Sequence, residues 1–169
     1  TDLYYLKDAM ENENFDVESF SFLSGDKELK KGDTLIIASP KRDLTDEERS
    51  KLADFLSKGG KAVFLMDPLK EDLPNFESLL EPYGVTLEKS VVIEGNQSYF
   101  YNTPLLLVPR MEGHEVTNPI MSSKLSVVLP VARSIQMPEK KKEGVTVDPL
   151  FTSTELSWTK TDPESKNLQ

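Results

Sequence analysis

Polar side chains follow two short apolar runs, at the positions where an α/β sheet places a binding site. Lys41, Arg42 and Asp43 come soon after the first run, and Asp67 directly follows the second. Ligands of open α/β sheets bind beyond the carboxyl ends of the strands. The bases could hold an anion or a partner's carboxylate, and the acids could orient a hydroxyl or a cation. The alternative is structural: Asp67 can cap a turn before Pro68, and Asp43 can accept backbone N–H groups at a helix entry.

A second candidate surface is aromatic. Tyr99 and Tyr101 flank Phe100 in a loop-rich stretch that also contains Gln97 and Asn102. Exposed aromatic rings beside amides can stack on a sugar or anchor a protein partner. The alternative is that these rings cover a sheet as part of the core.

Missing residue types and motifs exclude several kinds of chemistry. The 169 residues include no cysteine, so disulfides, thiolate metal sites and cysteine nucleophiles are excluded. The sequence has no P-loop, no dinucleotide-binding glycine motif and no serine nucleophile elbow. Its single histidine, His114, lacks companions for a zinc site. We therefore expect no cofactor and no bound metal, while a hydrolase that uses carboxylates is left open.

The net charge and the hydropathy of the chain limit the kinds of partner that it can bind. The formal net charge is −9, which argues against nucleic-acid binding because that needs a surplus of Lys and Arg. The apolar runs have the length of strands, far below the ~20 residues of a membrane-spanning helix. We interpret the chain as a fragment of a longer protein, with any membrane anchor outside these residues.

The clearest predicted unit is a strand, a helix and a second strand. The apolar runs 34–38 and 62–66 have the composition of buried strands. Between them Thr45 and Glu48 have the spacing of a capping box, and Gly59 ends the helix. Short joins of this kind predict a right-handed βαβ unit with parallel strands.

Neighbouring segments extend this unit. Apolar spacing predicts a helix over 76–83 and strands over 15–22 and 85–93. Alternation of helices and strands indicates a doubly wound, mainly parallel α/β sheet.

Beyond Gly95 the helical pattern ends, and prolines divide the chain into short pieces. We expect a single α/β domain over 1–169, with a βαβ core at 1–95 and a strand- and loop-rich extension at 96–169.

The motifs also follow a familiar order. Six stretches carry it, namely Asp33–Glu48, Phe64–Pro68, Leu79–Val85, Asn118–Ile120, Leu129–Ser134 and Phe151–Trp158. In this order they resemble the auxiliary component of uncharacterised ABC-type transport systems, the gliding-motility-associated ABC transporter family.

This resemblance implies an extracytoplasmic domain, anchored by membrane helices outside this chain and partnered by the permease and ATPase of the same system. It also implies a fold related to the flavodoxin-like and class I glutamine amidotransferase-like group. Amidotransferases need a nucleophilic cysteine, which this chain lacks. The resemblance therefore implies a non-catalytic role, and it assigns no role to Lys41, Arg42, Asp43 or Asp67.

Three functional hypotheses follow. The first is a non-catalytic extracytoplasmic auxiliary domain of an ABC-type transport system, acting through protein or ligand contacts. The second is a domain for a small ligand such as a carbohydrate, using the strand ends together with Tyr99 and Tyr101. The third is a carboxylate-dependent hydrolase.

Overall fold

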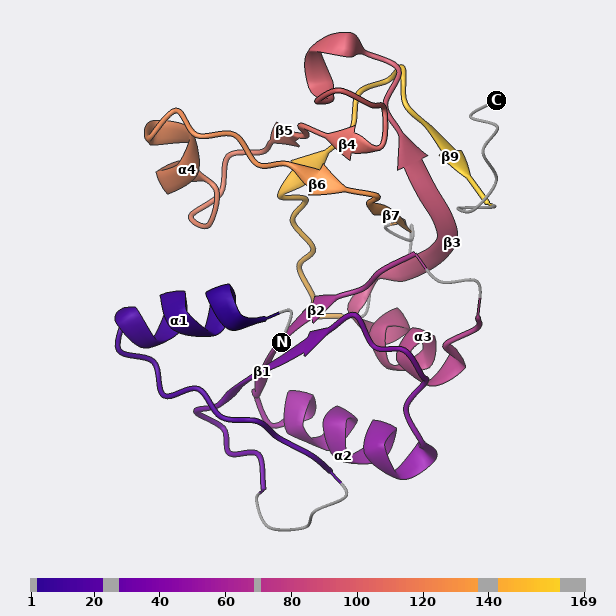
Figure 1. Ribbon diagram of the computed structural model, residues 1–169. Coiled ribbons are helices and arrows are strands. Elements are labelled where there is room, and N and C mark those ends of the chain that lie inside the picture. Colours follow the sequence, from indigo (N-terminus) through magenta and orange to yellow (C-terminus); the bar gives the residue numbers. More distant parts are fainter. Residues whose placement is uncertain (1–2, 23–27, 69–70, 137–142, 162–169) are drawn as a thin grey trace.

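A computed structural model of the chain describes residues 3–22, 28–68, 71–136 and 143–161 (Figure 1). Two parts are visible: a lower part built on two strands with their helices, and an upper part of short strands and loops. The elements are α1 (Tyr4–Asn12), β1 (Thr34–Ala38), α2 (Asp46–Ser57), β2 (Lys61–Leu65), α3 (Pro74–Leu80), η1 (Glu81–Tyr83), β3 (Thr86–Ile93), η2 (Gln97–Tyr99), β4 (Leu106–Leu107), β5 (Arg110–Met111), α4 (Asn118–Ser122), β6 (Leu129–Pro130), β7 (Arg133–Gln136), β8 (Phe151–Thr152) and β9 (Trp158–Lys160).

The structure confirms the predicted βαβ unit. β1 and β2 are parallel and in unbroken register over five residue pairs. The Thr45 hydroxyl accepts the Glu48 N–H at 3.2 Å, and the Glu48 carboxylate accepts the Thr45 N–H at 2.9 Å, which completes the capping box of α2. After α2, Gly59 has φ +87°, a conformation that glycine adopts without a steric penalty.

The core of the lower part lies on one face of the β1–β2 pair. Leu52 and Phe55 of α2 and Leu79 of α3 are buried there, against strand residues that include Ile37 and Phe64. Side chains alternate across a strand, so Val63 and Leu65 point to the opposite face. They are 42% and 47% exposed, which leaves that face of the pair incompletely covered.

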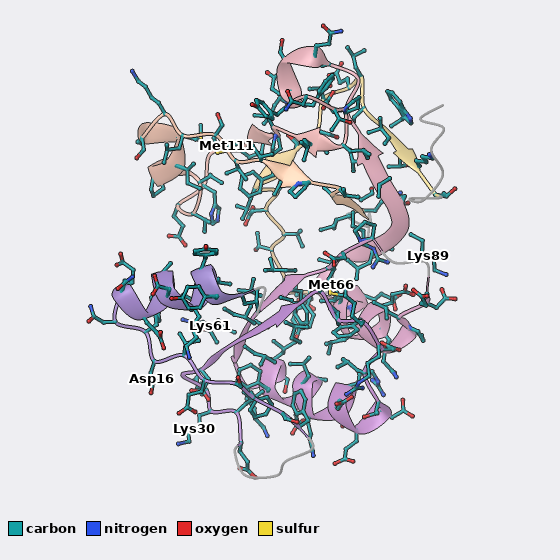
Figure 2. All side chains as sticks on the ribbon, in the orientation of Figure 1. Asp16, Lys30, Lys61, Met66, Lys89 and Met111 are labelled. Atoms are coloured by element: carbon teal, nitrogen blue, oxygen red, sulfur yellow. The ribbon has the colours of Figure 1, made fainter. Side chains whose placement is uncertain are left out.

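The upper part is antiparallel. β3 is the middle strand of a three-stranded sheet in the order β7-β3-β9, and both of its neighbours run antiparallel to it. Two further pairs, β4 with β6 and β5 with β8, are also antiparallel and only two residues long. Figure 2 shows the same division, with Met66 near the end of β2 and Met111 in the upper part.

The prediction of a doubly wound, mainly parallel sheet is wrong. Within the described residues β1 and β2 are the one parallel pair, and residues 15–22 form no strand. A parallel partner for β3 would need a crossover that carries the chain back to the same end of the sheet. The segments after β3 are instead short and separated by prolines, so the chain returns by loops and pairs antiparallel. The expected relation to the flavodoxin-like and amidotransferase-like group required a parallel sheet, so this prediction is wrong as well.

Candidate functional site

The ends of β1 and β2 bring Lys41 and Asp67 together. The Lys41 Nζ lies 3.2 Å from Asp67 Oδ2 and donates to Ser39 Oγ at 2.7 Å, while the Ser39 hydroxyl donates to the same carboxylate. The hydrogen bond from Ser39, aided by the nearby Lys41 ammonium, lowers the pKa of Asp67. Ser39 has φ +48°, an unusual backbone conformation for a residue other than glycine. These three side chains form one polar cluster at the strand ends.

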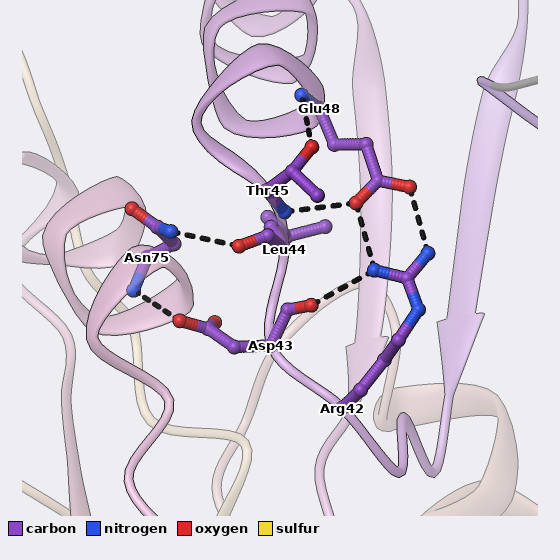
Figure 3. Close-up of polar contacts among 6 residues, drawn as sticks. All are labelled: Arg42, Asp43, Leu44, Thr45, Glu48 and Asn75. Carbon is purple, nitrogen blue, oxygen red and sulfur yellow. Dashed lines mark hydrogen bonds and ion pairs between the residues drawn. The ribbon is translucent and has the colours of Figure 1, made fainter.

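Arg42 points the other way, into the start of α2. Its guanidinium forms two parallel hydrogen bonds of 2.9 Å with the Glu48 carboxylate and a third, of 3.0 Å, with the Asp43 carbonyl (Figure 3). The bond from Arg42, together with the Thr45 N–H, lowers the pKa of the buried Glu48 to about 2. Glu48 therefore serves the capping box and the ion pair at once.

Asp43 has a structural role at a different helix. Its carboxylate accepts the N–H of Asn75 at 2.8 Å and the N–H of Phe76 at 3.2 Å, both in the first turn of α3. The Asn75 amide returns a hydrogen bond of 2.7 Å to the Leu44 carbonyl (Figure 3). The first turn of α3 has no side-chain cap from its own N-cap residue, Leu73, so Asp43 supplies it.

A cavity of about 310 Å³ lies beside this cluster. Its polar lining comes from Lys41, Arg42 and Asp43, and its apolar lining comes from Phe20, Phe22, Leu35, Ile36, Ile37, Pro40, Leu44 and Phe76. Three of the predicted site residues thus surround one space. Asp43 is the one carboxylate in this lining, and both of its oxygens already accept backbone N–H groups.

The aromatic candidates lie elsewhere. Tyr99 ends η2 in the upper part, and Tyr101 is 61% exposed just beyond it. Neither residue lines the cavity at the strand ends. The structure does not bring the two predicted surfaces together into one cleft.

Sequence reasoning missed two buried charges. Arg133 of β7 donates to the carbonyls of Glu88 at 2.6 Å, Leu87 at 3.4 Å and Asp67 at 3.4 Å, and so links β7 to β3 and to the segment after β2. Burial lowers its pKa, although the charge of Glu77 opposes the shift. The surrounding stretch Leu129–Ser134 stood out only through the family resemblance, because a lone arginine in a sequence gives no sign of burial.

Glu94 is the second buried charge that the sequence did not reveal. It is 1% exposed and accepts hydrogen bonds from the N–H and hydroxyl of Thr154 and from the Asn96 N–H, at 2.6 to 3.0 Å. Burial opposes its ionisation, yet these hydrogen bonds hold its pKa below the usual range. Glu94 ties the loop before β9 to the end of β3.

The polar groups of the site are largely used within the chain. In the part of the chain that the structure describes, every buried side-chain nitrogen or oxygen has a hydrogen-bond partner. No group of three His, Asp or Glu residues in the same part is arranged to hold a metal ion. The groups that remain able to bind another molecule are the apolar lining of the cavity and the ammonium of Lys41, whose side chain is 73% exposed.

Fold and site together define a mixed α/β domain whose strand-end charges are paired within the chain. The fold is similar to that of a solved structure, the mmIFT52 N-terminal domain, with a TM-score of 0.64 and 16% sequence identity. The similarity covers 92% of this chain and 71% of that one, and at this identity it shows the fold alone.

The chain belongs to the family described as "ABC-type uncharacterized transport system", whose model matches residues 1–169. The family places the chain among the auxiliary components of such transport systems. No curated protein matches the chain. Within the described residues, no helix is both long and apolar enough to cross a membrane.

Proposed function

We propose that the chain is a non-catalytic, extracytoplasmic module that acts through protein contacts within its ABC-type transport system, whose permease and ATPase are its partner subunits. The sequence resemblance to the gliding-motility branch of the family suggests the extracytoplasmic side and a membrane anchor outside these residues. The family match supports the transport assignment. The contact role comes from how the domain uses its polar and apolar side chains.

The observation that carries the proposal is the pairing of the strand-end charges. Arg42 is bound to Glu48, Asp43 to the first turn of α3, and Asp67 to Ser39 and Lys41. Catalysis by carboxylates needs an acid or base that can exchange a proton with substrate. A carboxylate that is fully engaged with backbone N–H groups, as Asp43 is, serves structure instead.

Exposed apolar side chains support the same proposal. Among the described residues, sixteen large hydrophobic side chains are exposed, whereas ten hydrophobic residues are buried. Leu125, Ile135 and Leu156 in the upper part are each at least 60% exposed, and Tyr4 and Tyr5 of α1 are 63% and 84% exposed. Exposed apolar side chains that lie next to each other, as those of Tyr4 and Tyr5 do, can form an interaction surface.

The experiment is co-purification of the permease and ATPase with the affinity-tagged full-length protein from detergent-solubilised membranes. We expect both subunits to co-purify at fixed ratio, and Asp43→Asn and Asp67→Asn variants that fold to retain them. Protease added to intact cells with a permeabilised outer layer should cleave the domain. Absence of both subunits, or protection from the protease, would contradict the proposal.

Small-ligand binding is the second candidate, favoured by one observation. The cavity volume of about 310 Å³ lies at the lower end of the range for small-molecule pockets. Thermal unfolding in the presence of millimolar sugars and anions tests it, since an occupied site raises the melting temperature. No shift with any of these ligands would count against it.

A further inference from the structure

The cavity at the strand ends is lined in part by β1. Three consecutive residues of β1, Leu35, Ile36 and Ile37, line it, and none of its lining residues belongs to β2. Side chains of consecutive strand residues point to opposite faces, so a space that touches all three reaches the backbone from the side. That side is the edge away from β2. Phe20 and Phe22, whose rings lie 4.8 Å apart edge to face, also line the cavity, and Phe22 packs against the core of the lower part as well.

The backbone register shows which groups face this groove. The Ser39 N–H donates to the Leu65 carbonyl at 2.8 Å, so the N–H and C=O groups of residues 35 and 37 also point to β2. The N–H and C=O groups of Ile36 and Ala38 therefore point into the groove. Among the described residues, β1 pairs with β2 alone. An unpaired strand edge of this kind is a template for another strand.

We propose that this groove is a strand-acceptor site, which binds an extended apolar segment of a partner polypeptide along β1. The proposal rests on the proposed function, since it specifies how the module contacts its partner. Main-chain hydrogen bonds to Ile36 and Ala38 hold the segment, and its side chains pack against Phe20 and Phe22. This is the mode of recognition known as β-strand addition.

The lining also sets the chemistry and direction of the segment. The Lys41 ammonium has three N–H donors and uses two of them, on Ser39 and Asp67. The third is available to a carboxylate at the carboxyl end of β1. In this proposal the segment runs parallel to β1, with an acidic residue at its carboxyl end beside Lys41.

A second copy of this chain is a poor occupant. Each chain carries a formal net charge of −9, so two copies repel each other. The apolar strands β1 and β2 of a second copy are also already paired with each other. The partner is therefore a different polypeptide.

The test uses an acetylated heptapeptide, Lys-Thr-Val-Ile-Val-Ile-Asp, as the probe with the full chain. Amide hydrogen exchange by NMR should show the Ile36 and Ala38 amides exchanging faster than those of Leu35 and Ile37 before the probe is added. Saturating probe should slow Ile36 and Ala38 by ~10-fold or more and leave Leu35 and Ile37 unchanged. The same peptide N-methylated at alternate residues, and the peptide of reversed sequence, should not do so.

Two variants and a matched control locate the binding. Ala38→Pro removes one N–H donor that faces the groove, a change that an edge strand tolerates, and Phe20→Ser removes part of the wall. Both should weaken probe binding ~10-fold or more, as a loss of one hydrogen bond and one apolar contact predicts. Phe15→Ser is the control, because Phe15 is 60% exposed and does not line the groove.

The outcomes separate this inference from the proposed function. Equal binding of the N-methylated peptide, or protection of Ile36 and Ala38 in the chain alone, would overturn the strand-acceptor site. Dimers in analytical ultracentrifugation that Ala38→Pro dissolves would overturn the choice of partner. If the permease and ATPase co-purify equally well with Ala38→Pro, the transport assignment stands and the acceptor site is wrong.

Discussion

Glu48 is the residue whose charge the structure uses most fully. Its carboxylate is 6% exposed, accepts two hydrogen bonds from Arg42 and closes the capping box of α2. Its pKa falls from the usual value near 4.5 to about 2 in the folded chain. A depressed pKa means that the folded state favours the ionised form. This group therefore stabilises the fold at neutral pH, and that contribution is lost as the pH falls from about 4.5 to 2.

We predict that Glu48→Gln lowers the free energy of unfolding by about 2 to 3 kcal/mol at pH 7. Urea unfolding measured from pH 7 to pH 2 checks it. The difference between wild type and variant should shrink as the pH falls below 4.5, because wild type then loses the ionised carboxylate. Glu47→Gln is the control, since Glu47 lies in the same turn with a side chain 78% exposed. A constant difference at all pH values would contradict the prediction.

At the scale of elements, the junction of α2 and β2 depends on the absence of a side chain. A Cβ atom on Gly60 would lie 2.5 Å from the ring of Phe55, which is buried in the core. We predict that Gly60→Ala lowers the free energy of unfolding by about 1 to 3 kcal/mol through overpacking. Gly32→Ala is the control, because nothing lies within 4 Å of its Cβ position. Equal midpoints of thermal unfolding for the two variants would contradict this.

The sequence predicts elements that local spacing defines. The capping box of Thr45 and Glu48 and the helical stripe around Phe76 and Leu79 are signals within a few residues, and both helices form. The direction in which β3 pairs with its neighbours is not encoded by such local signals. An apolar run fits a parallel or an antiparallel neighbour equally well, and the partners of β3 lie more than 40 residues further along the chain.

Contacts between residues far apart in the sequence also limit what could be predicted about the candidate site. Position at a strand end correctly grouped Lys41 and Asp67, which form an ion pair. The partners of Asp43 could not be predicted, because the N–H groups that it accepts lie 32 and 33 residues away. Burial of Arg133 and Glu94 is set by tertiary packing that no local pattern encodes.

At the scale of the whole molecule, Arg133 joins the upper part to the lower. Its guanidinium donates to carbonyls of β3 and to the Asp67 carbonyl beyond β2. We predict that Arg133→Met lowers the free energy of unfolding by about 2 to 4 kcal/mol, because buried acceptors lose a charged donor. Arg110→Met, which removes an exposed bond to Ser153, should change it by less than about 1 kcal/mol. Chemical denaturation of both variants distinguishes them.

The cap that Asp43 provides for α3 has a consequence for folding order. A seven-residue helix is too short to persist by itself in water. Its first-turn N–H groups are accepted by a side chain that takes its position only after β1 and the start of α2 have formed. We therefore expect α3 to form only after β1 and the start of α2, and to lose its first-turn hydrogen bonds when the loop that follows β1 unfolds. Asp43 joins α3 and the loop after β1 into one cooperative unit. A change in the length of that loop, or of the loop before α3, should therefore first cause fraying of α3.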